Sequence, residues 1–171
     1  KRGGQTLAFN DTEAVASKKI TGAYRFYFGT SKQRLVACDT EVYKEDEDDT
    51  WTEIKGSLTT GLKTYFNTWG ALSKVLVCNG TEEMWSWDGS SDVALTLADG
   101  VPAMALPYQD RLLTIINDSN GGNLTWSGSF SDTEGNWETI ANTGVRPDIK
   151  LFGMINHSFS NADSGYDAAV L

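Results

Sequence analysis

The stretch Arg34-Leu35-Val36-Ala37-Cys38-Asp39 consists of a basic residue, a short apolar run and a turn-forming Asp. The same pattern recurs at Lys74-Val75-Leu76-Val77-Cys78-Asn79 and at Arg111-Leu112-Leu113-Thr114-Ile115-Ile116-Asn117. The first two copies align cysteine with cysteine, so the period is about forty residues, a length typical of array architectures. The sequence therefore predicts three equivalent strands, at Leu35–Cys38, Val75–Cys78 and Leu112–Ile115.

Two more strand-like segments follow each apolar run. They are Val42–Tyr43 and Trp51–Ile54 in the first unit, Met84–Trp87 and Val93–Leu95 in the second, and Leu124–Trp126 and Trp137–Ile140 in the third. Turn-forming residues separate them, at Asp39-Thr40, Asn79-Gly80, Asp88-Gly89 and Asn120-Gly121-Gly122. Asn-Gly and Asp-Gly are strong hairpin signals because both central residues of a type I′ turn need a positive φ. Each unit is therefore predicted to be a β-meander.

A further aromatic or apolar segment precedes each run, at Gly22–Gly29, Thr64–Trp69 and Pro102–Tyr108, which gives roughly four strands per unit, the size of one propeller blade. We predict an all-β, β-propeller-like array of about three to four four-stranded antiparallel blades. The blades are expected at approximately 20–56, 62–97 and 101–142, with the start of a fourth at 148–171. A closed propeller takes at least about four blades. We therefore expect the single all-β repeat domain of residues 1–171 to be a fragment of a larger propeller, or else an open, curved array.

Composition favours a soluble all-β protein. The chain has 17 Gly, 3 Pro, 7 Phe, 6 Tyr and 6 Trp, so it is rich in residues that form turns and strands. No apolar run approaches the roughly 18 residues of a membrane helix, so no membrane partner is expected. The N-terminal Lys1-Arg2-Gly3-Gly4-Gln5-Thr6-Leu7 lacks the apolar region of a signal peptide, and we expect it to be an internal segment of a longer chain.

The sequence offers no catalytic, cofactor-binding or metal-binding residues, and we predict that the protein is not an enzyme and needs no cofactor. His157 is the only His, which excludes a multi-His metal site, and none of the common nucleotide-binding or hydrolase motifs occurs. Asp132, Glu134 and Glu138 flank Trp137 and could suggest a glycosidase, but a polar connection before a strand that buries Trp137 is favoured. Cys38 and Cys78 follow apolar residues within predicted strands, so we expect free core cysteines rather than a disulfide.

The acidic run Glu45-Asp46-Glu47-Asp48-Asp49 is a candidate calcium loop because dense carboxylates can hold that ion. Counted from Asp46, oxygen ligands occupy the first, third and fifth positions of such a loop. Trp51 stands where the sharp turn needs Gly, however, and Ser57 where the bidentate Glu belongs. A solvated hairpin tip is therefore favoured over a metal site.

The net charge of −9, from 14 Lys plus Arg against 23 Asp plus Glu, argues against nucleic acid as a direct partner. A protein that binds phosphates needs a basic face, since counterion release drives that binding. The basic residues here occur mostly singly along the sequence, as at Arg34, Lys55, Lys63, Lys74, Arg111 and Arg146.

Several motifs give the chain a resemblance to virion proteins of tailed bacteriophages with a β-propeller-like platform, found among head-to-tail connector and tail nozzle or stopper components. The motifs include Val75 to Gly80, Trp85-Ser86-Trp87-Asp88-Gly89, Val101-Pro102-Ala103, Gln109 to Leu113, Leu124 to Ser127 and Gly135-Asn136-Trp137, together with Arg2-Gly3-Gly4 ahead of Tyr24-Arg25-Phe26-Tyr27. The likeness spans roughly residues 2–148 and brings no catalytic residue. It implies a structural protein of the phage particle, assembled in the bacterial cytoplasm, whose partners are other virion proteins or copies of itself in a ring. The relatives are several hundred residues long.

The alternative hypothesis is a carbohydrate- or receptor-binding β-propeller, in which exposed Trp and Tyr side chains stack on sugar rings. Such a module needs several of the six Trp exposed at one face, whereas a structural platform buries them as fold determinants. The solvent exposure of the Trp side chains therefore discriminates between the two functions.

Overall fold

The computed structural model describes residues 18–28, 31–46, 50–97, 100–108, 111–118, 121–127, 137–140, 155–159 and 166–170. Apart from a short 3-10 helix, every regular element in these ranges is a β-strand, so the predicted all-β class is confirmed. The chain divides into two compact units, Lys1–Lys63 and Thr64–Leu171, and each is described by itself. Within the described ranges, no helix is long and apolar enough to cross a membrane.

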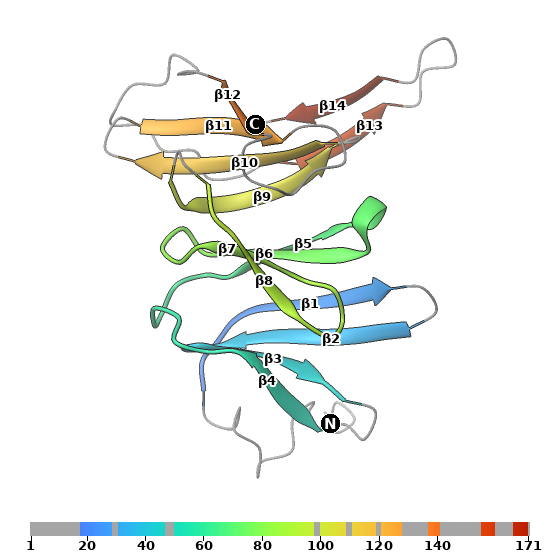
Figure 1. The fold of residues 1–171 in the computed structure, drawn as a ribbon, viewed down its shortest axis with the longest axis vertical. Coiled ribbons are helices and arrows are strands. Elements are labelled where there is room, and N and C mark those ends of the chain that lie inside the picture. The colour runs from blue at the N-terminus through green and yellow to red at the C-terminus, as the bar shows by residue number, and fades with distance from the viewer. Residues whose placement is uncertain are drawn as a thin grey trace, which may run out of the picture. The chain divides into compact units, whose positions relative to one another are not determined.

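The first unit contains one four-stranded antiparallel sheet in the order β1-β2-β3-β4 (Figure 1). Its strands are β1 (Ile20–Phe28), β2 (Ser31–Cys38), β3 (Glu41–Glu45) and β4 (Trp51–Lys55). The two-residue turn Asp39-Thr40 joins β2 to β3, and Asp39 has a φ of 55°, a left-handed conformation that Asp tolerates better than most residues. Short connections between sequential strands make this sheet a meander, as predicted.

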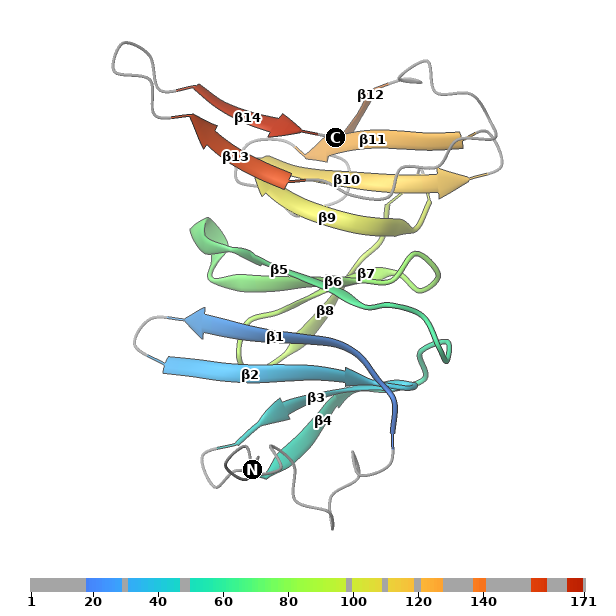
Figure 2. The same ribbon diagram turned by 180° about the vertical axis from the view of Figure 1, so that it is seen from behind.

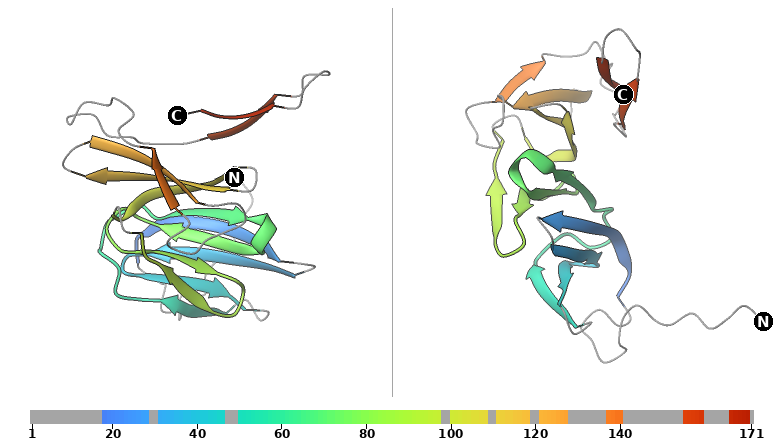
Figure 3. Two further views of the ribbon diagram at one scale, coloured as in Figure 1. Left: turned by 45° about the horizontal axis from the view of Figure 1, so that its top comes forward. Right: turned by 90° about the vertical axis from the view of Figure 1, so that its right-hand side faces the viewer.

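The second unit contains two more four-stranded antiparallel sheets and one two-stranded sheet. The second sheet has the order β5-β6-β7-β8, formed by β5 (Tyr65–Trp69), β6 (Lys74–Cys78), β7 (Met84–Trp87) and β8 (Asp92–Leu95), with the 3-10 helix η1 (Gly70–Leu72) after β5. The third has the order β12-β11-β10-β9, formed by β9 (Pro102–Tyr108), β10 (Arg111–Asp118), β11 (Gly121–Ser127) and β12 (Trp137–Ile140). The hairpin of β13 (Ile155–Phe159) and β14 (Tyr166–Val170) is drawn in red in Figure 3.

The predicted equivalence of the three apolar runs is confirmed. They form β2, β6 and β10, and each is the second strand of its sheet, paired antiparallel with the strand before it and the strand after it. The segments expected to precede them form β1, β5 and β9. The repeat therefore encodes the same four-stranded meander three times. In a propeller, such sheets are arranged around a central axis. That arrangement stays a prediction for this chain.

A shared hydrophobic core joins the second and third sheets. Trp69, Leu76, Cys78 and Met84 of the second sheet cluster with side chains of the third sheet, namely Ala105, Leu112 and Ile116. The Asn67 amide also donates a hydrogen bond of 3.2 Å to the carbonyl oxygen of Ala105, and β9 lies beside β5 and β6 (Figure 2). All four residues from Val75 to Cys78 are buried. A continuous apolar run is what a strand covered on both faces needs.

The predicted hairpins at Asn79-Gly80 and Asp88-Gly89 are present, but the predicted type I′ turns are wrong. Only the glycines have a positive φ, +82° at Gly80 and +102° at Gly89. The Asn79 side-chain oxygen accepts the amide hydrogens of Thr81 and Glu82, and the Asp88 carboxylate accepts those of the two residues after Gly89. These side chains act as local acceptors in longer loops, which removes the need for a left-handed Asn or Asp.

Candidate functional site

One face of the first sheet carries a row of side chains that crosses all four strands, charged on β1 to β3 and aromatic on β4. Arg25 on β1 lies opposite Arg34 on β2, and Arg34 forms a two-point ion pair with Glu45 on β3. Glu45 in turn lies opposite Trp51 on β4. Because side chains directly opposite one another in an antiparallel sheet share a face, these four residues lie on one face of the first sheet, which we call its charged face.

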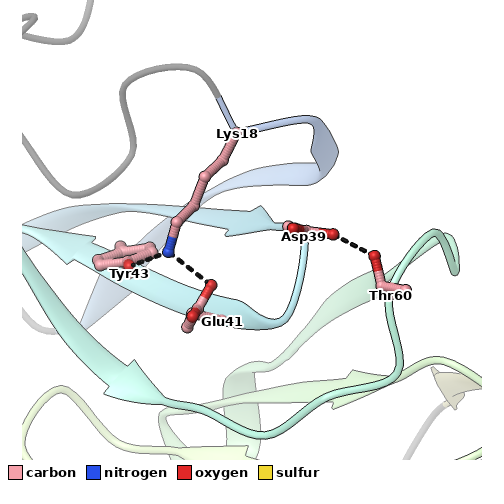
Figure 4. Close-up of polar contacts among 5 residues, drawn as sticks. All are labelled: Lys18, Asp39, Glu41, Tyr43 and Thr60. Carbon is pink, nitrogen blue, oxygen red and sulfur yellow. Dashed lines mark hydrogen bonds and ion pairs between the residues drawn. The ribbon is translucent and has the colours of Figure 1, made fainter.

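A second polar cluster lies on the same face, at the other end of the strands. Lys18 Nζ donates hydrogen bonds of 2.8 Å to Glu41 Oε2 and 3.0 Å to the Tyr43 hydroxyl (Figure 4). The Lys18 ammonium also lies 5.5 Å from the centre of the Tyr43 ring, within range of a cation–π interaction. Glu41 and Tyr43 are two residues apart on β3, and period-two alternation places them on one face.

The pKa shifts in this cluster favour the charge states that these groups already have near neutral pH. The hydrogen bonds to Glu41 and then to Tyr43 raise the pKa of Lys18, and the hydrogen bond from Lys18 lowers the pKa of Glu41. Lys18 therefore stays protonated and Glu41 stays ionised. Burial raises the pKa of the neighbouring Cys38 thiol, which keeps it in its unreactive form. A lysine that acts as a general base near neutral pH needs a lowered pKa, and a glutamate that acts as a general acid needs a raised one. A nucleophilic thiolate also needs a lowered pKa. All three shifts here have the opposite direction.

Hydrogen bonds join the Asp39-Thr40 turn to the residue before β1 and to the segment that follows β4. The Asp39 amide donates to the carbonyl oxygen of Lys19 over 2.9 Å, and the Leu58 amide donates to that of Thr40 over 2.9 Å. The Thr60 hydroxyl also donates to the Asp39 carboxylate (Figure 4). These bonds hold the end of the β2–β3 hairpin next to Lys18 and Glu41, so the cluster is a fixed part of the sheet.

A groove of about 370 Å³ opens on the first sheet. Its lining is mainly apolar and includes two arginines. The lining residues are Ile20, Ala23, Tyr24, Arg25, Arg34, Leu35, Val36 and Trp51. Next to the Arg25–Arg34 pair on the same face, Ala23 lies opposite Val36. Ala23 is small and exposed, and Val36 is buried. The volume is near the lower limit of the roughly 300–1,000 Å³ found for ligand pockets.

The acidic run was predicted to be a hairpin tip, and the strand pairing supports that prediction, since Glu45 pairs with Trp51 across the β3–β4 connection. Lys44 Nζ lies 2.6 Å from Asp46 Oδ1, and the Thr52 hydroxyl donates to the other Asp46 oxygen. Lys44 and then Thr52 lower the pKa of Asp46. Residues 47–49 lie outside the described residues. In the described part of the chain, no three His, Cys, Asp or Glu side chains are placed to hold a metal ion.

Four of the six tryptophans have described side chains, and all four are buried, with exposed fractions of 8% for Trp51, 1% for Trp69, 2% for Trp85 and 3% for Trp87. The predicted burial of Trp85 and Trp87 is thus confirmed. Both cysteines are free and buried, as expected, and burial raises the pKa of Cys78 to about 12.

Several residues singled out in the sequence fall outside the described part of the structure. The side chains of Trp126, Trp137, Glu138 and His157 are among them, and so are all atoms of Asp132 and Glu134. Asp110 lies outside the described residues, and the Arg111 guanidinium donates a hydrogen bond of 3.0 Å to the carbonyl oxygen of Ser127.

The sequence analysis did not predict that the residues of the charged face share one side of the sheet, and it did not single out Lys18 and Glu41. Glu41-Val42-Tyr43 alternates polar and apolar residues, which marks a strand with one polar face, and Glu45 continues that face. This signal predicts which side chains share a face but not which partners they find, because Lys18 and Arg34 come from other strands or from outside them.

Comparisons with protein-family models, with curated proteins and with solved structures gave no match to this chain.

Proposed function

We propose that this chain is a non-enzymatic structural protein of a bacteriophage or prophage particle, a propeller platform for protein–protein contacts in the head-tail or tail region of the virion. The observation that carries the proposal is the charged face of the first sheet. Arg34 is paired with Glu45 and Lys18 with Glu41, and an apolar groove lies beside them. A surface of this kind suits contact with another protein better than turnover of a substrate.

The charge states of the cluster support the non-enzymatic part of the proposal. General acid–base catalysis works best when the pKa of the catalytic group lies near the working pH. The shifts at Lys18 and Glu41 move both pKa values away from neutrality, and the Cys38 thiol also moves away from the thiolate. The described groups of this face hold a structure together and are not poised to transfer protons.

Two lines support the phage setting and the propeller. The first is the resemblance of the repeat motifs to phage connector and tail proteins with such a platform. The second is the observed meander of four antiparallel strands, which occurs three times and matches the strand number of a propeller blade. In the second unit, two of these sheets share a core, as neighbouring blades do.

The carbohydrate-binding alternative is weaker. The alternative requires several exposed tryptophans at one face, and the four tryptophans with described side chains are at most 8% exposed. They serve as core residues, each burying about 150–250 Å². A glycan panel with the purified chain is expected to show no binding, and strong binding to one sugar class would favour the alternative instead.

The location in the particle can be tested directly. Particles of the phage or induced prophage that encodes the chain would be purified on a density gradient and analysed by quantitative mass spectrometry. We expect the chain to co-sediment with the particles in a constant ratio to their major structural proteins. Detection only in the soluble fraction, with intact particles lacking the chain, would overturn the proposal.

A further inference from the structure

The first strand of the first sheet, β1, lies at one edge of that sheet. In the described part of the chain, β1 has one neighbour, β2, and its nine residues make it one of the longest strands. The backbone N–H and C=O groups on its outer side form a template for another strand, which natural proteins protect unless the edge is used. β1 also carries two of the three exposed large hydrophobic side chains in the described residues, Ile20 at 51% and Tyr27 at 58% exposure.

The charges along the row that crosses the sheet are unbalanced at this edge. Arg25 and Arg34 lie directly opposite each other, an arrangement that is destabilising for like charges. Glu45 pairs with Arg34 and balances one of the two guanidinium groups. Arg25 is exposed and, among the described residues, forms no ion pair. A carboxylate on a fifth strand, opposite Arg25, would complete the row.

The groove determines which side chain of the fifth strand suits the position next to that carboxylate. Along a strand, residues two apart point to the same face. A residue two positions from the one opposite Arg25 therefore lies opposite Ala23, whose small side chain lines the groove with Val36 and Trp51. An apolar side chain at that position would cover the hollow, while a charged one would lose its hydration there.

We propose that β1 and the adjacent groove bind an extended segment of a partner protein, which adds a fifth strand to the first sheet with an acidic residue opposite Arg25 and an apolar residue opposite Ala23. The proposal rests on the proposed function, because it names the kind of partner that the platform would take. Backbone hydrogen bonds to β1 provide affinity, and the groove and Arg25 provide specificity, as in other cases of strand addition.

The test uses the complete 171-residue chain and a short synthetic peptide in which valine, aspartate and valine alternate with threonine. Binding is followed by amide chemical shifts of Gly22 to Phe28 in the NMR spectrum and by calorimetry. Matched peptides replace the aspartate with asparagine or carry N-methyl groups on the edge that faces β1. The variants are Arg25→Gln, Arg25→Glu and, as a control of equal charge change outside the groove, Lys32→Gln.

We expect shifts confined to β1 and the groove, and an affinity about two- to fivefold weaker for the asparagine peptide or for Arg25→Gln, the range of an opposite-charge cross-strand pair. Lys32→Gln should bind like the unmodified chain, and the N-methylated peptide should not bind. Arg25→Glu should prefer a peptide with lysine in place of aspartate, which excludes misfolding as the cause of any loss.

Equal binding of the aspartate and asparagine peptides, equal effects of Arg25→Gln and Lys32→Gln, or retained binding of the N-methylated peptide would each overturn the proposal. Sedimentation without peptide compares the unmodified chain with Arg25→Glu. If the unmodified chain self-associates and Arg25→Glu does not, the partner is a second copy of the chain. A negative peptide result together with the chain in purified particles would overturn this inference and leave the proposed function standing.

Discussion

Lys18 Nζ lies 2.8 Å from Glu41 Oε2, and this ion pair joins a residue two positions before β1 to the first residue of β3. Both side chains are partly exposed, 28% and 21%, so we expect a modest coupling energy of about 0.2–1 kcal/mol. A double-mutant cycle with Lys18→Met, Glu41→Gln and the combined variant, measured by urea unfolding, would determine it. Lys32→Met serves as the control for loss of a surface charge. A coupling energy of zero would show that the pair does not stabilise the sheet.

The same pair predicts how stability depends on pH. The pKa of Glu41 is lowered by folding, so its contribution is present above its unfolded value of about 4.3 and is lost as the pH falls through the folded pKa. The pKa of Lys18 is raised, so its contribution is present below about 10.4 and is lost as the pH rises through the folded value. The coupling energy measured in the cycle should therefore be constant between about pH 5 and 10. It should fade as the pH falls from about 4.3 through the folded pKa of Glu41, and as the pH rises from about 10.4 through the folded pKa of Lys18.

Trp87 is 3% exposed, and its replacement by alanine removes a large buried side chain. We expect Trp87→Ala to lower the free energy of unfolding by about 3–5 kcal/mol, and we expect the same range for Trp137→Ala. Val93 on β8 is 48% exposed, so Val93→Ala should change it by less than about 0.5 kcal/mol. Thermal and urea unfolding of the three variants would measure this. An unchanged stability in both tryptophan variants would favour exposed ligand platforms over core residues.

The Asp88 carboxylate accepts hydrogen bonds from the amides of Ser91 and Ser90, and these lower its pKa to about 2. Its contribution to stability is present above the unfolded value of about 3.9 and is lost as the pH falls toward 2. We expect Asp88→Asn, which keeps an acceptor oxygen, to remove this part of the acid dependence. The measurement is the free energy of unfolding between pH 2 and 5, where parallel curves for the two proteins would contradict the assignment.

Gly80 combines a φ of +82° with a close backbone neighbour. A Cβ at this position would lie 3.3 Å from the Ala103 Cα, and the Gly80 amide donates to the carbonyl oxygen of Pro102 over 3.0 Å. We expect Gly80→Ala to destabilise the protein by about 1–2 kcal/mol, the cost of a left-handed conformation for a residue with a Cβ. Gly70→Ala meets no atom within 4 Å and should be nearly neutral. Equal stabilities of the two variants would show that the turn can rearrange.

The sequence predicted the strands well because each strand depends on local pattern. The apolar runs of β2, β6 and β10, the glycine and asparagine turns, and the tryptophans of β7 all carry their signal within a few residues. The turn type at Asn79-Gly80 was wrong because the side chain of Asn79 accepts two amide hydrogens, a competing interaction that a dipeptide preference does not include.

The charged face could not be predicted in the same way. Lys18 meets Glu41 across 23 positions of the chain, and Arg34 meets Glu45 across a hairpin, so both pairs depend on strand register. The groove was not predicted either, because it is formed where the small Ala23 lies beside Val36 and where Trp51 of β4 lines the same hollow. Register fixes these neighbours, and register was not assigned from the sequence.

The last prediction concerns DNA, which passes through the connector and tail of a phage. The net charge of −9 repels phosphate, and the three ion pairs found among the described residues neutralise Lys18, Arg34 and Lys44 within the first unit. Affinity for duplex DNA requires several cations that release counterions together. We therefore expect no measurable duplex binding at near-physiological salt and no steep salt dependence at low salt. A mobility-shift titration would measure both, and sub-micromolar, salt-sensitive binding would contradict the exclusion of nucleic acid as a direct partner.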